Sequence, residues 1–156
     1  MPPYDKIWKA VIRELFDNFL TFFFPQLYEH IEVIKGFKFL DKELRLPGGR
    51  RKSGSHYPDM LVQVWLRNGE KPCVLIHIEV QGYHDKNFTK RMFIYFYHLF
   101  DLGYEKIAAI SIFTDARQEY KPDKYEYKFD ETILMYKFRT YKIVEQNEAK
   151  LMRKEN

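Results

Sequence analysis

The feature that most constrains the fold of this chain is an apolar run at residues 73–80, which reads Cys-Val-Leu-Ile-His-Ile-Glu-Val. Its length and β-branched content predict a strand, and its nearly continuous apolar character predicts that both faces of the strand are covered. Helices cover both faces of a sheet mainly in α/β proteins. Because side chains alternate along a strand, His77, Glu79 and Gln81 should point to one face of the sheet.

The segments around this strand predict a mixed β-sheet flanked by helices, in the order helix, strand, strand, strand, helix, strand. Apolar residues recur at helical spacing from Lys6 to Phe24, where Asp5 can cap the helix and Pro25 can end it. A second helix is expected over 86–102, and Gly103 ends it. The other expected strands are residues 37–46, 59–66 and 107–113, with further extended pieces at a sheet edge over 125–129 and 132–144.

Composition limits the class of protein further. The 156 residues are 46% apolar and 18% aromatic, which is enough for a hydrophobic core and excludes disorder over most of the chain. The single cysteine, Cys73, excludes a disulfide scaffold and suggests a reducing compartment. No signal peptide or membrane span is visible, so we expect a cytoplasmic protein with no membrane partner. A net charge of +4 favours a polyanionic partner only weakly.

Two carboxylates come close together if the chain turns at Asn68-Gly69. With a three-residue loop at 68–70, Asp59 lies opposite Glu79, and such pairs have Cβ atoms about 4.5–5.5 Å apart. With a two-residue turn, the two acids point to opposite faces of the sheet. Like charges side by side on a central strand repel, and a divalent cation would remove that cost, since Mg²⁺ is often held by one or two carboxylates and phosphate oxygens.

Three other groups of residues are candidates for the same site. Gln81 shares the face of Glu79, and its amide could orient a water molecule or contact a phosphate oxygen, but it carries no charge. Glu14, at the border of the first helix, is either an additional carboxylate or an exposed residue on the helix flank. The consecutive Arg50, Arg51 and Lys52 lie in a Gly- and Ser-containing loop, which is either simply solvated or, beside an active site, able to bind phosphates.

The motif carried by these residues resembles that of a known superfamily. Tyr57-Pro58-Asp59, followed twenty residues later by Glu79-Val80-Gln81, resembles the PD-(D/E)XK nuclease motif with Gln in place of the usual Lys. The flanking text includes Phe-Leu-Asp-Lys-Glu-Leu at 39–44, His-Ile at 77–78, Arg-Met-Phe-Ile-Tyr at 91–95 and Ile-Phe-Thr-Asp at 112–115. With these flanks, residues 5–144 resemble the Rpn (YhgA-like) family of recombination-promoting nucleases, also described as transposases.

This resemblance implies a restriction-endonuclease-like core and Mg²⁺-dependent cleavage of DNA, with Mn²⁺ able to substitute. It implies that Asp59 and Glu79 bind the metal, that Glu14 corresponds to an acid on the first helix of many such enzymes, and that Gln81 takes the place of the motif lysine. A family pattern on the helix after the motif matches Arg91 and Tyr95. We therefore take the DNA-binding candidates to be Arg50, Arg51, Lys52, Arg91 and Tyr95.

Two functional classes follow from the sequence. The first is a metal-dependent DNA endonuclease linked to recombination or transposition, and the second is a weakly active or inactive nuclease-fold protein that binds DNA or a protein partner. A homodimer is one of the partner states left open. Residues 1–144 would form the nuclease-like domain and 145–156 a polar tail. Three histidines near the motif lack the spacing of a zinc site and are interpreted as core or loop residues: His56, His77 and His84.

Overall fold

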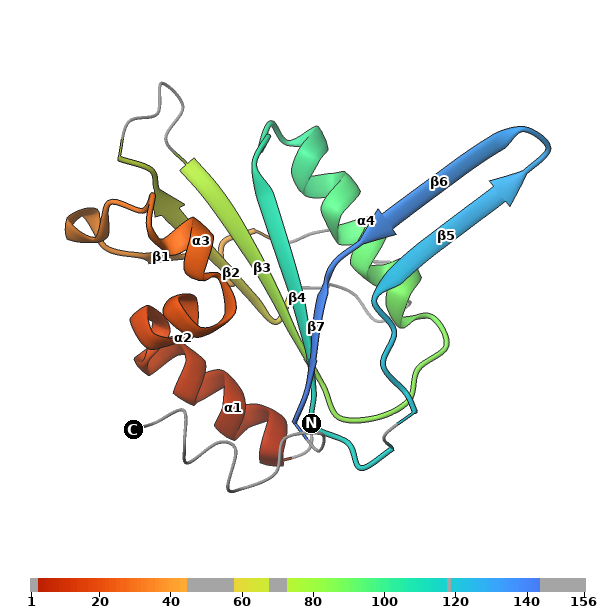
Figure 1. The fold of residues 1–156 in the computed structure, drawn as a ribbon, viewed down its shortest axis with the longest axis horizontal. Helices are drawn as coiled ribbons and strands as arrows, with labels where there is room; N and C mark the ends of the chain where they lie inside the picture. The colour runs from red at the N-terminus through yellow and green to blue at the C-terminus, as the bar shows by residue number, and fades with distance from the viewer. Residues whose placement is uncertain (1–2, 45–57, 68–72, 118, 144–156) are drawn as a thin grey trace.

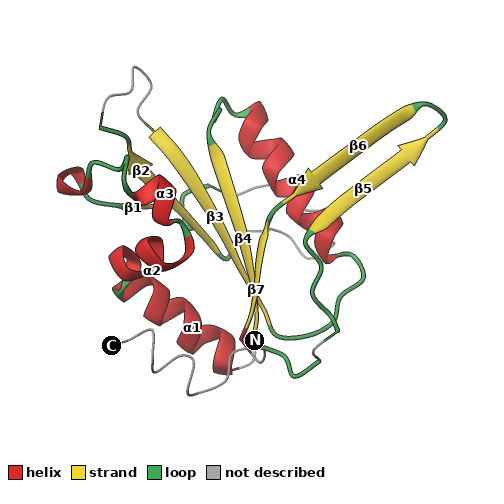
Figure 2. Cartoon of the chain, in the orientation of Figure 1, coloured by secondary structure: helices red, strands yellow, loops and turns green. Residues whose placement is uncertain are grey.

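The computed structural model describes residues 3–44, 58–67, 73–117 and 119–143 and shows a mixed five-stranded sheet between two layers of helices (Figures 1 and 2). The strand order is β1-β2-β3-β4-β7, with antiparallel pairing between β1, β2 and β3 and parallel pairing between β3, β4 and β7. These strands are β1 (Lys38–Phe39), β2 (Met60–Trp65), β3 (Cys73–Gln81), β4 (Ile107–Phe113) and β7 (Arg139–Lys142). The predicted α/β class is therefore confirmed.

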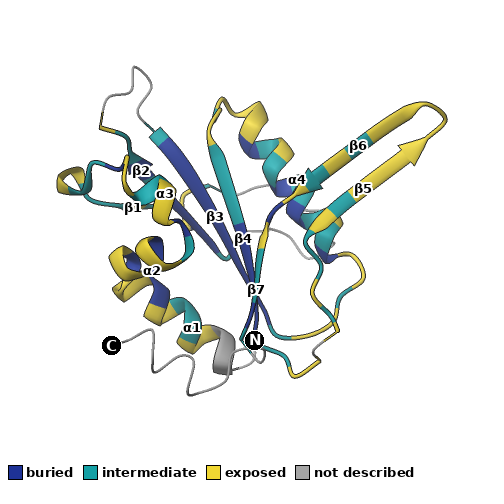
Figure 3. Ribbon diagram, viewed as in Figure 1, coloured by how far each residue is buried: buried dark blue, intermediate teal, exposed yellow. Residues whose placement is uncertain are grey.

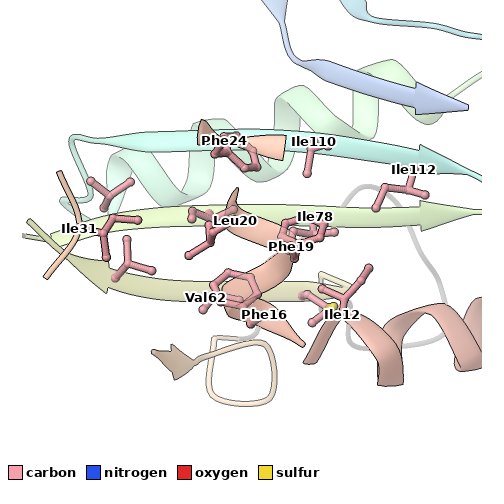
Figure 4. Packing of buried hydrophobic residues seen from close by; sticks show 14 of the residues in the cluster. Ile12, Phe16, Phe19, Leu20, Phe24, Ile31, Val62, Ile78, Ile110 and Ile112 are labelled. Atoms are coloured by element: carbon pink, nitrogen blue, oxygen red, sulfur yellow. The ribbon is translucent and has the colours of Figure 1, made fainter. Parts of the chain in front are cut away.

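One face of the sheet is covered by helices from the N-terminal part of the chain. These are α1 (Pro3–Glu14), α2 (Phe16–Phe23), α3 (Pro25–Tyr28) and the short 3₁₀ helix η1 (Val33–Lys35). Figure 4 shows Phe16, Phe19 and Leu20 of α2 packed over Val62 and Ile78 of the sheet. All of these side chains are buried, and this cluster is the larger part of the hydrophobic core.

The other face is covered by α4 (Phe88–Asp101), the crossover helix between the parallel strands β3 and β4. Leu99 and Tyr95 of α4 pack against Leu61 and Leu75, so β3 is buried along nearly its whole length (Figure 3). This arrangement agrees with the cover on both faces predicted from its apolar sequence.

The first predicted helix differs from the structure because it is broken at Leu15. The backbone there leaves helical geometry (φ −112°, ψ 39°), although neither Pro nor Gly is present. The ring of Phe16 packs edge-on against Phe37 and Phe39, with centroids 5.0 and 5.6 Å away. We infer that this aromatic contact fixes the turn between α1 and α2. The helix also begins at Pro3, so Asp5 lies inside α1 and not at its N-terminal boundary, where it was predicted.

The strand expected over 37–46 is much shorter than predicted in its described part, residues 37–44; residues 45 and 46 lie outside the described residues. Lys38 and Phe39 pair with β2, and the N–H of Leu40 donates to the carbonyl of Leu61. The chain then turns, with the backbone N–H groups of Glu43 and Leu44 donating to the carbonyl of Leu40. Asp41 is buried at this turn and accepts a hydrogen bond from Arg13 of α1 at 2.9 Å. An inward-pointing aspartate paired with the helix ends the alternation that the sequence suggested.

The extended pieces expected near the C-terminal end divide into two structures. β7 lies at the edge of the main sheet, whereas β5 (Lys124–Phe129) and β6 (Thr132–Lys137) form a separate two-stranded hairpin that projects from the body (Figure 1). The predicted tail, residues 145–156, lies outside the described residues. In the described ranges, no helix has the length and apolar character needed to cross a membrane.

A buried ion pair joins β7 to the loop after β4. Lys142 is 1% exposed, and its Nζ lies 2.8 Å from Asp115 Oδ1 and 2.9 Å from the carbonyl oxygen of Tyr120. Lys142→Ala should lower the free energy of unfolding by about 3–5 kcal/mol, because it leaves the Asp115 carboxylate unpaired. Lys124→Ala, which breaks the exposed pair with Glu126, should cost less than about 1 kcal/mol. Equal losses for the two variants in urea unfolding would contradict this interpretation.

Candidate active site at the Asp59–Glu79 acid pair

The pairing of β2 with β3 brings the two acids of the sequence motif together. Trp65 pairs with Cys73 and Met60 with Ile78. Continued by one residue, this register places Asp59 opposite Glu79. The alternative register, with the acids on opposite faces of the sheet, is wrong.

Asp59 and Glu79 are interlocked through each other's backbone. The N–H of Asp59 donates to Glu79 Oε2 at 2.7 Å, and the N–H of Val80 donates to Asp59 Oδ2 at 2.9 Å. Each carboxylate therefore fixes the strand that carries the other. Glu79 is 6% exposed near the end of β3, whereas the side chain of Asp59, just before β2, is 23% exposed, so the pair lies at a margin of the core.

Two neighbouring groups offset the repulsion between these carboxylates. Lys9, on α1, places its Nζ 2.7 Å from Asp59 Oδ1. His77, which is fully buried, places its Nε2 3.0 Å from Glu79 Oε2. Burial, and after it the charge of Glu79, raises the pKa of Asp59 from its ordinary 3.8 to about 6, although Lys9 acts in the opposite direction. The pKa of the Asp59 carboxyl therefore lies closer to neutral pH than that of an ordinary aspartate.

A second cation, Arg91 of α4, is held beside the acid pair. Its Nη1 lies 2.7 Å from Asp85 Oδ2, in the loop after β3. Burial favours a lower pKa for Arg91, but the hydrogen bond that Arg91 donates to Asp85 and the charge of Glu79 outweigh it, so the pKa is raised. Asp85 in turn has a lowered pKa because the hydrogen bond from Arg91 outweighs the effect of burial. Arg91 therefore stays charged and fixed near Glu79.

Gln81 lies one step beyond Glu79 on the same face of β3. It is 5% exposed, and its Nε2 donates to the carbonyl oxygen of Tyr83 at 3.1 Å. In the register of the sheet it is level with Phe113 of β4 and Lys142 of β7. The strand continues unbroken to Gln81, which gives Gln81 the predicted orientation, and its amide is engaged by the Tyr83 carbonyl.

The structure separates the other predicted site residues from this group. Glu14 is exposed at the end of α1, so the helix presents Lys9 rather than Glu14 to Asp59. Tyr95 is 3% exposed, and its ring lies edge-on to His77 with centroids 5.3 Å apart, so it is a core residue and not a surface contact for DNA. The predicted phosphate-binding residues Arg50, Arg51 and Lys52 lie outside the described residues.

Two carboxylates are too few ligands for an ion held by protein groups alone, but they are the number that commonly binds Mg²⁺. In the part of the chain that the structure describes, no three His, Cys, Asp or Glu side chains form a group able to hold a metal, so the three-carboxylate set with Glu14 is not formed. Mg²⁺ commonly binds one or two carboxylates and completes its shell with water and substrate phosphates. Asp59 and Glu79 fit that requirement.

Sequence reasoning missed two members of the site. Lys9 was one of several polar residues on the outer side of the first helix, and nothing in its spacing marked it as the partner of Asp59. His77 was interpreted as an ordinary core histidine, although its place two residues before Glu79 on the same strand face was a usable signal. Comparison of the chain with family models, curated proteins and solved structures finds no match, so the resemblance to the Rpn family stays a prediction.

In metal-free buffer, Asp59→Asn should change the pH dependence of stability. The folded pKa of Asp59 is about 6 and the ordinary value is 3.8, so the native state binds more protons between these values. The ionisation of Asp59 therefore destabilises the wild type as pH rises from about 4 to 7, by up to about 3 kcal/mol. Because asparagine does not titrate, the free energy of unfolding of the variant should rise relative to wild type over this range.

Urea unfolding at several pH values in the presence of EDTA measures this difference. Asp101→Asn, at an exposed position at the end of α4, is the matched control and should run parallel to wild type. A parallel profile for Asp59→Asn as well would contradict the assignment of a raised pKa to Asp59.

Proposed function

We propose that this chain is a metal-dependent nuclease that hydrolyses DNA phosphodiester bonds. The observation that carries the proposal is the interlocked pair of Asp59 and Glu79, two largely buried acids fixed side by side at the end of the sheet. Buried acids placed together are costly, and such arrangements concentrate at functional sites. The resemblance of the motif around them to PD-(D/E)XK nucleases, and within these to the Rpn family, supports the same function and a link to recombination or transposition.

The chain's own residues supply positions and charge for this chemistry. When bound, Mg²⁺ polarises a phosphoryl oxygen and lowers the pKa of water. Asp59 and Glu79 would hold the ion, and their mutual backbone hydrogen bonds keep the carboxylates in place before substrate arrives. Arg91, fixed by Asp85, is positioned to attract the phosphate of the DNA backbone. Gln81 can contribute only the dipole of its amide.

The positive charge that the motif lysine would provide has another source here. Lys9 contacts Asp59 from the opposite side of the strand end, on a different element from Gln81. An ammonium group at this place can stabilise the charge that develops on the phosphate in the transition state. We assign that role to Lys9 within the proposed nuclease.

A second candidate function is a nuclease-fold protein that binds DNA or a protein partner without cleaving. The observation in its favour is that Asp59 is already paired with Lys9, and Glu79 with His77. The repulsion between the two acids is therefore offset without a metal ion. The two functions differ in whether a divalent ion adds anything to the protein.

Asp59→Ala should separate these two functions. We expect Mg²⁺- or Mn²⁺-dependent nicking of plasmid DNA by wild type, and at least a 100-fold lower rate for Asp59→Ala, because a metal ligand is lost. Asp101→Ala should keep the wild-type rate. In thermal melts, Mn²⁺ at ten times its dissociation constant should stabilise wild type by about 1.4 kcal/mol and should not stabilise Asp59→Ala. DNA binding without any metal-dependent nicking by wild type would favour the second function.

The role of Lys9 can be tested by moving its charge. Lys9→Met should lower the cleavage rate about 100-fold, which is the usual cost of removing one group that stabilises transition-state charge. Gln81→Lys in the same background should restore at least a tenfold part of this loss, because it returns a positive charge one step beyond Glu79 on the same strand face. Lys6→Met, an exposed change on the same helix, is the control. Wild-type activity in Lys9→Met would remove Lys9 from the mechanism.

A further inference from the structure

The hairpin of β5 and β6 has two chemically different faces. In its register, Tyr125 pairs with Tyr136, Tyr127 with Leu134 and Phe129 with Thr132. Side chains that pair across strands share a face, so these residues make one face almost wholly aromatic or aliphatic. The other face is mixed and carries Lys124, Glu126, Lys128, Ile133, Met135 and Lys137.

The body of the protein covers only the base of the aromatic face. Tyr125 stacks on Phe93 of α4 with ring centroids 5.5 Å apart, and Tyr136 lies 4.9 Å from Phe96. Farther along the hairpin, Phe129 is 72% exposed. Figure 1 shows the hairpin extending beyond α4, and Figure 3 shows most of its outer length as exposed.

The aromatic surface continues onto the outer side of α4. Tyr97 neighbours Phe93, and Phe100 stacks on Phe96 with centroids 5.8 Å apart. Tyr97 and Phe100 are both more than half exposed. We define the aromatic arm surface by its four exposed rings: Tyr97, Phe100, Tyr127 and Phe129.

The size and aromatic character of this surface are typical of an interaction site. An aromatic side chain buries about 150–250 Å² when fully covered, so the four rings leave roughly 450 Å² of mostly apolar area in water. Half-buried neighbours such as Leu134 add to it. The largest apolar patch on a typical monomer is about 300–600 Å² and is often a functional surface. An isolated two-stranded hairpin is also only marginally stable in water, so an arm of this kind gains most from a packed face.

We propose that the aromatic arm surface is the interface of a symmetric dimer of this chain. Two copies that face each other would bury roughly 900 Å² from these rings alone. Because apolar atoms make up about 60% of such interfaces, the total would be about 1,500 Å², the usual size of a stable interface. In a two-fold arrangement, each arm lies on the α4 and arm of the other copy, so the same patch serves both sides.

The chemistry of the surface disfavours other occupants. Nucleic acid needs cationic side chains to meet its phosphates, and the lysines of the hairpin are on its other face. Residues 145–156 of this chain contain only Leu151 and Met152 as large apolar side chains, which is too little to cover four rings. The proposal does not depend on the nuclease function.

Phe129→Asp tests the interface against a matched control on the same hairpin. Ile133 is 70% exposed, nearly the same as Phe129, but it lies on the opposite face, so Ile133→Asp should leave the dimer intact. In sedimentation velocity from about 1 to 100 µM, we expect a wild-type dimer and at least a 100-fold weaker dissociation constant for Phe129→Asp. Tyr97→Asp should weaken the dimer in the same way from the helix side.

Phe129 is mostly exposed and lies at the far end of the hairpin, so its replacement should leave the far-UV circular dichroism and the melting temperature of the monomer unchanged. A monomeric wild type at 100 µM would overturn the proposal and would mean that a different protein covers the arm. Equal weakening by Phe129→Asp and Ile133→Asp would also overturn it, because the dimer would then use another surface or both faces.

Discussion

The antiparallel pairing of β2 with β3 is the constraint on which the rest of the site depends. A shift of one residue would turn Asp59 to the other face of the sheet and exchange the two sets of side chains that β2 presents to its two faces. The hydrophobic residues on alternate positions of both strands, packed under α1 and α2, therefore select the register. This register places Asp59 opposite Glu79. Each carboxylate then accepts a hydrogen bond from a backbone N–H of the other strand, which joins the two strands at this end of the sheet.

The face of the sheet that α4 covers carries both apolar and polar side chains of β3. Near the start of β3, Leu75 joins the α4 core, whereas His77, Glu79 and Gln81 follow it toward the carboxyl end. Because β3, β4 and β7 are parallel, their carboxyl ends lie at one edge, which is where ligands usually bind in α/β sheets. The polar row is buried but compensated, since cations approach it from both helical layers: Lys9 from α1 and Arg91 from α4.

Sequence reasoning recovered the parts of this structure that depend on local periodicity. The bounds of β4 agree with prediction, β2 and β3 differ from it by a residue or two, and the strand face shared by Glu79 and Gln81 follows from alternation alone. The misses all depend on contacts between distant segments. The break at Leu15 reflects packing of Phe16 on Phe37 and Phe39, and the end of β1 reflects the pairing of Asp41 with Arg13. Lys9 became part of the site for the same reason, because only the docking of α1 on the sheet brings it to Asp59.

The helix α4 connects the candidate site with the arm. Its inner side carries Met92, Tyr95 and Leu99, all buried against the sheet, and Arg91 at the margin of the acid pair. Its outer side is also aromatic, where a surface helix would normally be polar. An apolar stripe on a second side of a helix is typical of a helix that packs against another surface there. The hairpin covers part of that outer side, so the composition of α4 itself favours a second protein surface over the remainder.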